Sequence, residues 1–367
     1  MLATSHVLCD NQSLMLKTMD GNGNEITMEY SGSNGGCSSC SGGGSNQLSR
    51  IIYPTFEKTF VYDKVGRKVS EDDILDAENS YRSLFRYDPA GNLVSKTDKE
   101  GKTTYYAYDA LSRLVSVIDP KSGETRYAYD GRDNLASLTD AEGNVTRFAY
   151  NRNNQLIREI RPLLQETAYS YDGAGNLVEK IDAKNQKTSY GYDDTGKLFE
   201  IRYFAVSTDT VPAKTVAFTY DAIGNLTGYD DGTTSGTCGY DALSQKISES
   251  VNYGPFTKTN AYTYLKNGVK QTFTGPDGIY YGYLYDQNNQ LTGVQVPNLG
   301  FITINDYTWN LPASITLPGG TTREFEYDPL MRIKNSTSKD PGQNVMLNYA
   351  YDYDKMDNIK AKTTEHG

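Results

Sequence analysis

The chain has 367 residues and a formal net charge of -10, and it contains no long run of Lys or Arg, which argues against nucleic acid or an anionic membrane as its main partner. No stretch approaches the 20 apolar residues that a membrane-spanning helix needs. With 31 Tyr against one Trp and two His, the composition indicates a protein of strands and turns with a partly hydrated aromatic face.

The first residues are examined for an export signal and for a metal site. Residues 1–18 lack the basic and apolar regions of an export signal. A strand is predicted over Leu2–Cys9, and a Gly/Ser/Cys-rich loop is predicted over residues 31–46. His6, Cys9, Cys37 and Cys40 have the spacing of a zinc ribbon. Residues three apart on a strand point to opposite faces, however, so a disulfide or free thiols remain alternatives and no metal site is predicted.

A repeat of 21 residues dominates the centre of the chain. Tyr recurs six times at that spacing from Tyr87 to Tyr192, and Asp follows it in five cases, with Asn151 as the exception. Similar units extend outward to both ends, where Asp20–Gly23 and Thr364–Gly367 resemble half-repeat turns and a weak copy lies near Asn305 and Asp306. We therefore expect one array over residues 1–367, cut from or degenerated from a longer one. Its anchors are Tyr87, Asp88, Gly91, Tyr108, Asp109, Tyr129, Asp130, Tyr150, Tyr171, Asp172, Gly175, Tyr192 and Asp193.

Each unit has two turn signals, as in Asp88–Gly91 and Asp98–Gly101. The segments between turns have strand length, and in triplets such as Phe148-Ala149-Tyr150 both aromatic side chains share one face. Gly91 and Gly175 are expected at positive φ. A single hairpin cannot bury its aromatic face, whereas a stack of hairpins can, so the repeat predicts an all-β, antiparallel hairpin ribbon. Such a ribbon leaves edges at its ends, and we expect these edges to add further strands.

Residues that suggest catalysis are explained more simply by structure. The acidic pairs Asp72-Asp73, Asp193-Asp194 and Asp230-Asp231 are expected at solvated turns rather than in a glycosidase site. His6 and His366 have no Ser or Cys partner at a recognisable spacing, and Cys238 is expected to be a buried small hydrophobic residue. We therefore predict no catalytic residue, no cofactor and no enzymatic activity.

The motif Tyr-Asp-x-x-Gly-Asn-Leu, as in Tyr87–Leu93 and Tyr171–Leu177, resembles the YD repeat of the RHS family, which includes bacterial polymorphic toxins, insecticidal toxin-complex shells, wall-associated proteins and teneurins. The resemblance implies a curved or spiralling sheet that forms part of a hollow shell, and in the toxin members that shell holds a C-terminal effector. No family-type core segment, self-cleavage motif or separate effector domain is recognised here.

The resemblance implies a structural shell segment of a secreted or cell-surface protein. Its partners would be neighbouring repeats or shell segments, and an encapsulated effector in the parent protein. Because exposed tyrosines can stack on sugar rings, a carbohydrate-binding or adhesion module is the alternative.

Overall fold

The computed structural model describes residues 6–9, 14–31 and 47–366. Their regular structure consists of strands and one single-turn 3₁₀ helix, η1 at Pro162–Leu164. The first half has β1(His6–Cys9), β2(Met15–Met19), β3(Glu25–Ser31), β4(Gln47–Ile52), β5(Glu57–Tyr62), β6(Lys68–Ile74), β7(Ser80–Tyr87), β8(Leu93–Thr97), β9(Thr103–Tyr108), β10(Leu114–Ile118), β11(Glu124–Tyr129), β12(Leu135–Thr139), β13(Val145–Tyr150), β14(Leu156–Arg161), β15(Gln165–Tyr171) and β16(Leu177–Ile181).

The second half continues in the same manner. It has β17(Lys187–Tyr192), β18(Leu198–Phe204), β19(Lys214–Tyr220), β20(Leu226–Asp230), β21(Ser235–Tyr240), β22(Lys246–Asn252), β23(Thr257–Tyr264), β24(Lys270–Thr274), β25(Tyr280–Tyr285), β26(Leu291–Val296), β27(Gly300–Thr308), β28(Leu311–Thr316), β29(Thr322–Tyr327), β30(Ile333–Lys339), β31(Val345–Tyr353) and β32(Ile359–His366).

The chain divides into two compact units. The first contains residues 1–106, 265–271 and 280–367, and the second contains residues 107–264 and 272–279. Within each unit, strands pair antiparallel with their neighbours in the sequence, as β5–β6–β7–β8 do in the first and β11–β12–β13–β14 in the second. The prediction of an all-β, antiparallel hairpin ribbon is confirmed.

A β-bulge recurs beside the repeated Tyr. Tyr129 pairs with Leu135, but Ala128 pairs with Ser137, so Ala136 is an extra residue on the strand that follows the turn. The same irregularity adjoins Tyr171, and it recurs in the hairpins β7–β8, β13–β14, β17–β18, β19–β20, β21–β22, β25–β26 and β29–β30. Because a bulge bends a strand and increases its twist, the bending is built into each of these hairpins.

The strands alternate in exposure as the aromatic triplets predict. Tyr127 and Tyr129 are half-buried on either side of the exposed Ala128, and Phe148, Ala149 and Tyr150 follow the same order. Among the hydrophobic side chains that the structure describes, Phe204 alone is buried, at 8% exposed. The accessible surface is 22612 Å², against about 14,600 Å² for a compact globular chain of this mass. Most of the hydrophobic side chains that the structure describes are therefore half-buried rather than fully buried.

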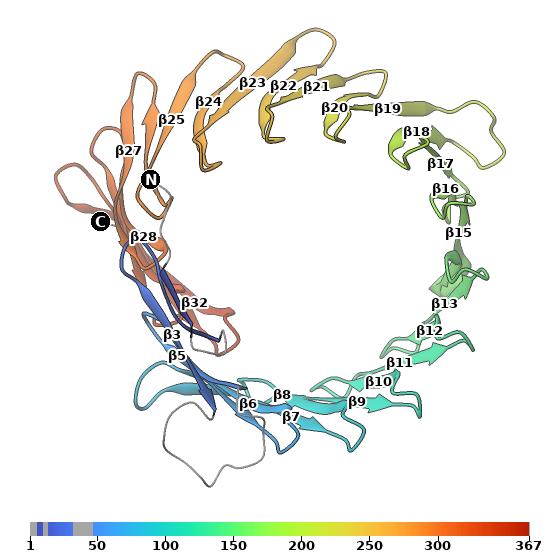
Figure 1. Ribbon diagram of the computed structural model, residues 1–367, viewed down its shortest axis with the longest axis horizontal. Coiled ribbons are helices and arrows are strands. Elements are labelled where there is room, and N and C mark those ends of the chain that lie inside the picture. Colours follow the sequence, from blue (N-terminus) through green and yellow to red (C-terminus); the bar gives the residue numbers. More distant parts are fainter. Residues whose placement is uncertain (1–5, 10–13, 32–46, 367) are drawn as a thin grey trace. The chain divides into compact units, whose positions relative to one another are not determined.

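In the first unit, segments from early and late in the sequence are in contact. The rings of Tyr53, just before β5, and Trp309, just before β28, lie 6.0 Å apart, and Figure 1 draws the blue and red parts of the chain in the same region. The predicted turn at Thr364–Gly367 is wrong as far as the structure describes it, because Thr364, Glu365 and His366 pair with Tyr349, Asn348 and Leu347 in the hairpin β31–β32. A strand forms here because the preceding strand offers it a full set of backbone partners.

Candidate functional site

The repeated Tyr connects each hairpin to the one before it. The hydroxyl of Tyr129 donates a hydrogen bond of 2.8 Å to the backbone oxygen of Leu114, and Tyr171 does the same to Leu156 at 2.9 Å. The acceptor is thus the first residue of the strand that follows the previous repeated Tyr and its turn. It recurs for Tyr30, Tyr62, Tyr87, Tyr220, Tyr240, Tyr264, Tyr285, Tyr307, Tyr327 and Tyr353. We call this set of bonds the tyrosine ladder.

Tyr307 replaces the weak copy that the sequence places at Asn305 and Asp306. These two residues belong to strand β27 and Tyr307 follows them, with its hydroxyl bonded to the Leu291 backbone oxygen. The sequence register is therefore wrong at this repeat. The turn after Tyr307 is shorter than the others, since Thr308 already pairs with Leu311.

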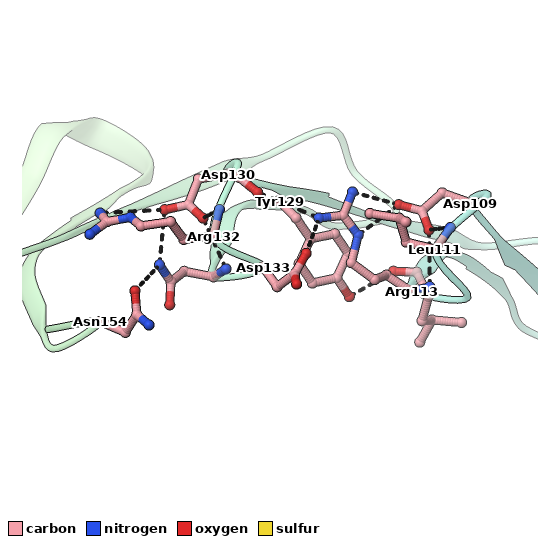
Figure 2. A network of polar contacts seen from close by, with 10 residues as sticks. Asp109, Leu111, Arg113, Tyr129, Asp130, Arg132, Asp133 and Asn154 are labelled. Carbon is pink, nitrogen blue, oxygen red and sulfur yellow. Dashed lines mark hydrogen bonds and ion pairs between the residues drawn. The ribbon is translucent and has the colours of Figure 1, made fainter. Parts of the chain in front are cut away.

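Where an Asp follows the repeated Tyr, it organises the turn that it begins. The carboxylate of Asp109 accepts hydrogen bonds from the backbone N–H of Leu111 and of Arg113, at 2.9 and 3.0 Å, and from the Arg113 guanidinium at 2.8 Å (Figure 2). The hydrogen bond from the Arg113 side chain is the main reason why the pKa of Asp109 lies below its ordinary value. These aspartates thus serve as charged acceptors for their own turns.

Neighbouring turns are bonded to each other along the ribbon. Arg113 reaches from its own Asp109 to the carboxylate of Asp133, at 2.7 Å, and to the Asp130 backbone oxygen, at 3.4 Å (Figure 2). One repeat further, the Asn134 amide donates to the Asn154 side chain at 3.0 Å. Arg332 in the first unit binds Asp328, Asp357 and the Asp354 backbone oxygen in the same way. The signature residues of the repeat therefore form hydrogen bonds and ion pairs that join one repeat to the next.

The sequence-predicted anchors occupy corresponding places in their units. Tyr87, Tyr108, Tyr129, Tyr150, Tyr171 and Tyr192 each end a strand. Asp88, Asp130, Asp172 and Asp193 each accept a backbone hydrogen bond from the residue four positions on, and Gly91 and Gly175 both have φ of +96°. Asn151 keeps the turn without a charge, because its amide oxygen accepts from the backbone N–H of Asn153 and of Gln155.

One acidic pair differs from its prediction. Asp72 and Asp73 lie within strand β6 and are 4% and 2% exposed, so they are not at a solvated turn. Asp72 binds Arg82 and accepts a hydrogen bond of 2.8 Å from the Ser70 hydroxyl. Asp73 forms ion pairs with Lys58, at 3.3 Å, and with Lys99. Cations supplied by neighbouring strands and turns make the burial possible, since a buried charge needs a partner.

The charges around Asp73 are balanced locally. Burial opposes ionisation of Glu71, but hydrogen bonds from Lys68 and Lys58 lower its pKa below the ordinary value. Burial likewise opposes the charge on Lys58, yet Glu71 and Asp73 raise its pKa. Every carboxylate in this cluster thus faces a cation, which is the arrangement of a structural ion-pair network. Of the other two pairs, Asp193 and Asp194 lie at a turn as predicted, and Asp230 ends strand β20 with Asp231 in the following turn.

The metal candidates are not brought together by anything that the structure describes. His6 and Cys9 are the two ends of β1, and Cys9 is exposed as a free thiol. Cys37 and Cys40, with most of the predicted 31–46 loop, lie outside the described residues. Within the described ranges, no group of three or more His, Cys, Asp or Glu side chains is placed to hold a metal ion. Cys238 is a half-buried free thiol rather than a fully buried one.

Sequence reasoning missed a set of contacts between the first and last repeats, which we call the seam. In each of them a half-repeat turn near the N-terminus meets a Tyr-Asp turn, or its equivalent, near the C-terminus. Asn22 donates to Asp286 at 3.0 Å, the Tyr53 ring lies 6.0 Å from that of Trp309, and the backbone N–H of Lys355 donates to Glu100 at 2.7 Å. The isolated Trp309 was the one signal in the sequence.

The comparisons with known proteins agree with this architecture. Residues 24–199 match the family model described as the teneurin YD-shell. A Tc holotoxin pore from Photorhabdus luminescens, mutated in TccC3, is similar at 16% identity and a TM-score of 0.65, over 96% of this chain and 20% of that one. Crystal structures of TcdB2-TccC3-Cdc42 and of TcdB2-TccC3 without its hypervariable C-terminal region follow at 13% and 14% identity, each with a TM-score of 0.60 over 98% of this chain and 22% of theirs.

The chain spans about a fifth of the length of those toxin chains. No curated protein matches its sequence. Over the part of the chain that the structure describes, there is no helix with the length and apolar character needed to cross a membrane.

Proposed function

We propose that this chain, which carries a YD-repeat array of the RHS family, is a non-catalytic wall segment of a hollow protein shell. The observation that carries the proposal is that Tyr, Asp and their turn partners bond one repeat to the next, as Tyr129 bonds to Leu114 and Arg113 to Asp133. A single sheet layer held in this manner suits a wall, because each repeat needs only its neighbours for stability.

The proposal extends to the parent protein. We place residues 1–367 in one continuous array, with neighbouring repeats or shell segments as its partners. In a longer secreted or cell-surface protein, the wall would enclose a C-terminal toxin. The support is the likeness to the fold of far longer Tc toxin chains, of which this chain spans about a fifth.

Small-angle X-ray scattering of the purified chain tests the wall. A solid globule of 367 residues has a radius of gyration of about 21 Å. A one-layer ribbon places the same mass farther from its centre, so a value well above that of the globule is expected. A radius of gyration near 21 Å would show a packed body and contradict the wall.

Carbohydrate binding is the second candidate. It is favoured by a cavity of about 800 Å³ in the first unit, whose lining includes Tyr283, Tyr285, Asn267, Gln271 and Asp286. Aromatic rings next to amide and carboxylate groups suit a sugar, which presents both apolar faces and hydroxyls. Glycan-array binding that rises with protein concentration and is lost in Tyr283→Ala would support this function. No binding to any glycan would exclude it.

A further inference from the structure

Two turns in different units share one sequence pattern. Tyr53–Phe56 joins β4 to β5, and Tyr253–Phe256 joins β22 to β23. In both, one variable residue follows the Phe and is followed in turn by Lys-Thr. In both turns the backbone N–H of the Tyr donates to the Phe backbone oxygen at 2.9 Å. The two rings stack in both, with centroids 4.6 Å apart in the first and 5.1 Å in the second. Residue 54 is Pro whereas Gly254 has φ of +89°, so different backbones build the same aromatic pair.

The two aromatic pairs differ in what covers them. In the first unit, Trp309 lies against Tyr53, with its ring tilted by 43°, and both Tyr53 and Phe56 are half-buried. In the second unit, Tyr253 and Phe256 are 43% and 53% exposed. The seam therefore shows which kind of group this aromatic pair accepts: a large apolar side chain at the tip of the turn that follows a ladder Tyr.

The second unit also carries uncovered turn tips of that kind. Leu111, Ile223 and Leu243 lie in turns that follow the repeated tyrosines Tyr108, Tyr220 and Tyr240, and they are 69%, 72% and 75% exposed. A large apolar side chain at the tip of a surface turn gains free energy only if something covers it. One chain thus presents both halves of the contact that its own seam makes between Tyr53 and Trp309.

We propose that the Tyr253–Phe256 turn is a docking site for the apolar turn tips of a second copy of this chain. The proposal rests on the wall function. It describes how two copies would associate: the turns at the edge of one ribbon would contact the turns at the edge of the next, in the same way as the seam contacts within one chain. The two surfaces are different, so the contact is heterologous, and further copies can add in the same direction. A sugar would stack on the same rings, but the seam provides a protein precedent at the equivalent turn.

Sedimentation velocity of the purified full chain over about 1 to 200 µM tests the docking. We expect mass above 40.8 kDa to appear as the concentration rises. Tyr253→Ser with Phe256→Ser should shift association at least about tenfold in concentration, as removal of an aromatic anchor does. Leu111→Ser with Ile223→Ser and Leu243→Ser should do the same. Mixing the two variants should restore a dimer, because each keeps the half that the other lacks.

The control is Val211→Ser, which removes an apolar side chain that is 77% exposed in the β18–β19 connection and should leave association unchanged. Unaltered far-UV circular dichroism shows that the variants fold. A monomer at every concentration overturns the docking. Association that persists in the turn variants but is lost in Val7→Lys also overturns it, because that result indicates strand addition at β1. The docking is likewise overturned if the wild type does not self-associate but binds a glycan and loses this binding in Tyr253→Ser. A large radius of gyration in a protein that stays monomeric would support the proposed wall function and contradict the docking.

Discussion

At the scale of single residues, the tyrosine ladder makes a prediction about one atom. Tyr129→Phe keeps the ring and removes the hydroxyl that donates to the Leu114 backbone oxygen. A hydrogen bond of this kind contributes about 1 kcal/mol, so the melting temperature should fall by about 3 °C. The matched control is Tyr105→Phe, because Tyr105 is 54% exposed and outside the ladder. Equal shifts in the two variants would show that the hydroxyl bond is not what joins the repeats.

One turn contains its own control for backbone strain. Gly175 has φ of +96°, whereas Gly173 in the same turn lies outside the positive-φ region and has open space where a Cβ would be. Gly175→Ala should cost about 1 kcal/mol, since a Cβ is disfavoured in the left-handed region. Gly173→Ala should be neutral or stabilise by a few tenths of a kcal/mol through the unfolded chain. Thermal melts of both variants, with Ala149→Ser as a surface reference, test which glycine occupies the left-handed position of the turn. A larger loss of stability in Gly173→Ala than in Gly175→Ala would contradict this assignment.

The turn aspartates predict an acid-dependent stability. The Asn176 side-chain hydrogen bond and the backbone bonds lower the pKa of Asp172 in the folded state. A carboxyl with a depressed folded pKa contributes stability above its unfolded pKa of about 4 and loses it as the pH falls below that value. Asp172→Asn, which imitates the natural Asn151 turn, should therefore be less stable than the wild type at pH 7, and the difference should shrink as the pH falls below about 4. A difference that stays constant as the pH falls from 7 to below about 4 would contradict this role of the carboxylate.

At the scale of strands and hairpins, the 21-residue repeat makes the strands, turns and aromatic faces predictable, because alternation and Asp-x-x-Gly signals are local. The bulge at Ala136 is not predictable in this way, since an extra strand residue looks like any other apolar residue after Leu135. The burial of Asp72 and Asp73 was also missed. It depends on Lys58 and Lys99 from neighbouring segments, and a turn-like pair of aspartates carries no sign of them.

The ion pairs around β6 should be worth more than those at the turns. Asp73→Ala leaves Lys58 and Lys99 without their shared carboxylate, in surroundings where Asp73 itself is 2% exposed. We expect a loss of about 2 kcal/mol, between the cost of an unpaired polar group and that of a broken buried ion pair. Asp133→Ala, which breaks an ion pair with a carboxylate that is 69% exposed, should cost less than about 1 kcal/mol. Urea denaturation compares them, and similar losses would contradict a structural network at β6.

At the scale of the whole molecule, the extensive contacts between strands join neighbours in the sequence, and the seam in the first unit is the exception. Its contacts join residues more than 250 positions apart, as between Gly21 or Asn22 and the Asp286 turn, or between Glu100 and Lys355. Closing so long a loop costs entropy and slows folding, so the seam should form last and open first. A ribbon can therefore keep its repeats intact while its first and last hairpins separate.

The single tryptophan makes that separation measurable. Trp309 packs against Tyr53, and its backbone oxygen accepts a hydrogen bond of 3.2 Å from Gln290. Tyr53→Ser with Asn22→Ala removes two seam contacts, so Trp309 emission should move to longer wavelength as water reaches the ring. Amide hydrogen exchange should quicken in β27 and β28 while β11–β16 in the second unit keep their protection. Tyr253→Ser, the same change in the equivalent turn of the second unit, should leave the emission of a dilute monomer unchanged. If emission and exchange in the Tyr53 variant match those of the wild type, the first and last repeats do not depend on the seam to stay together.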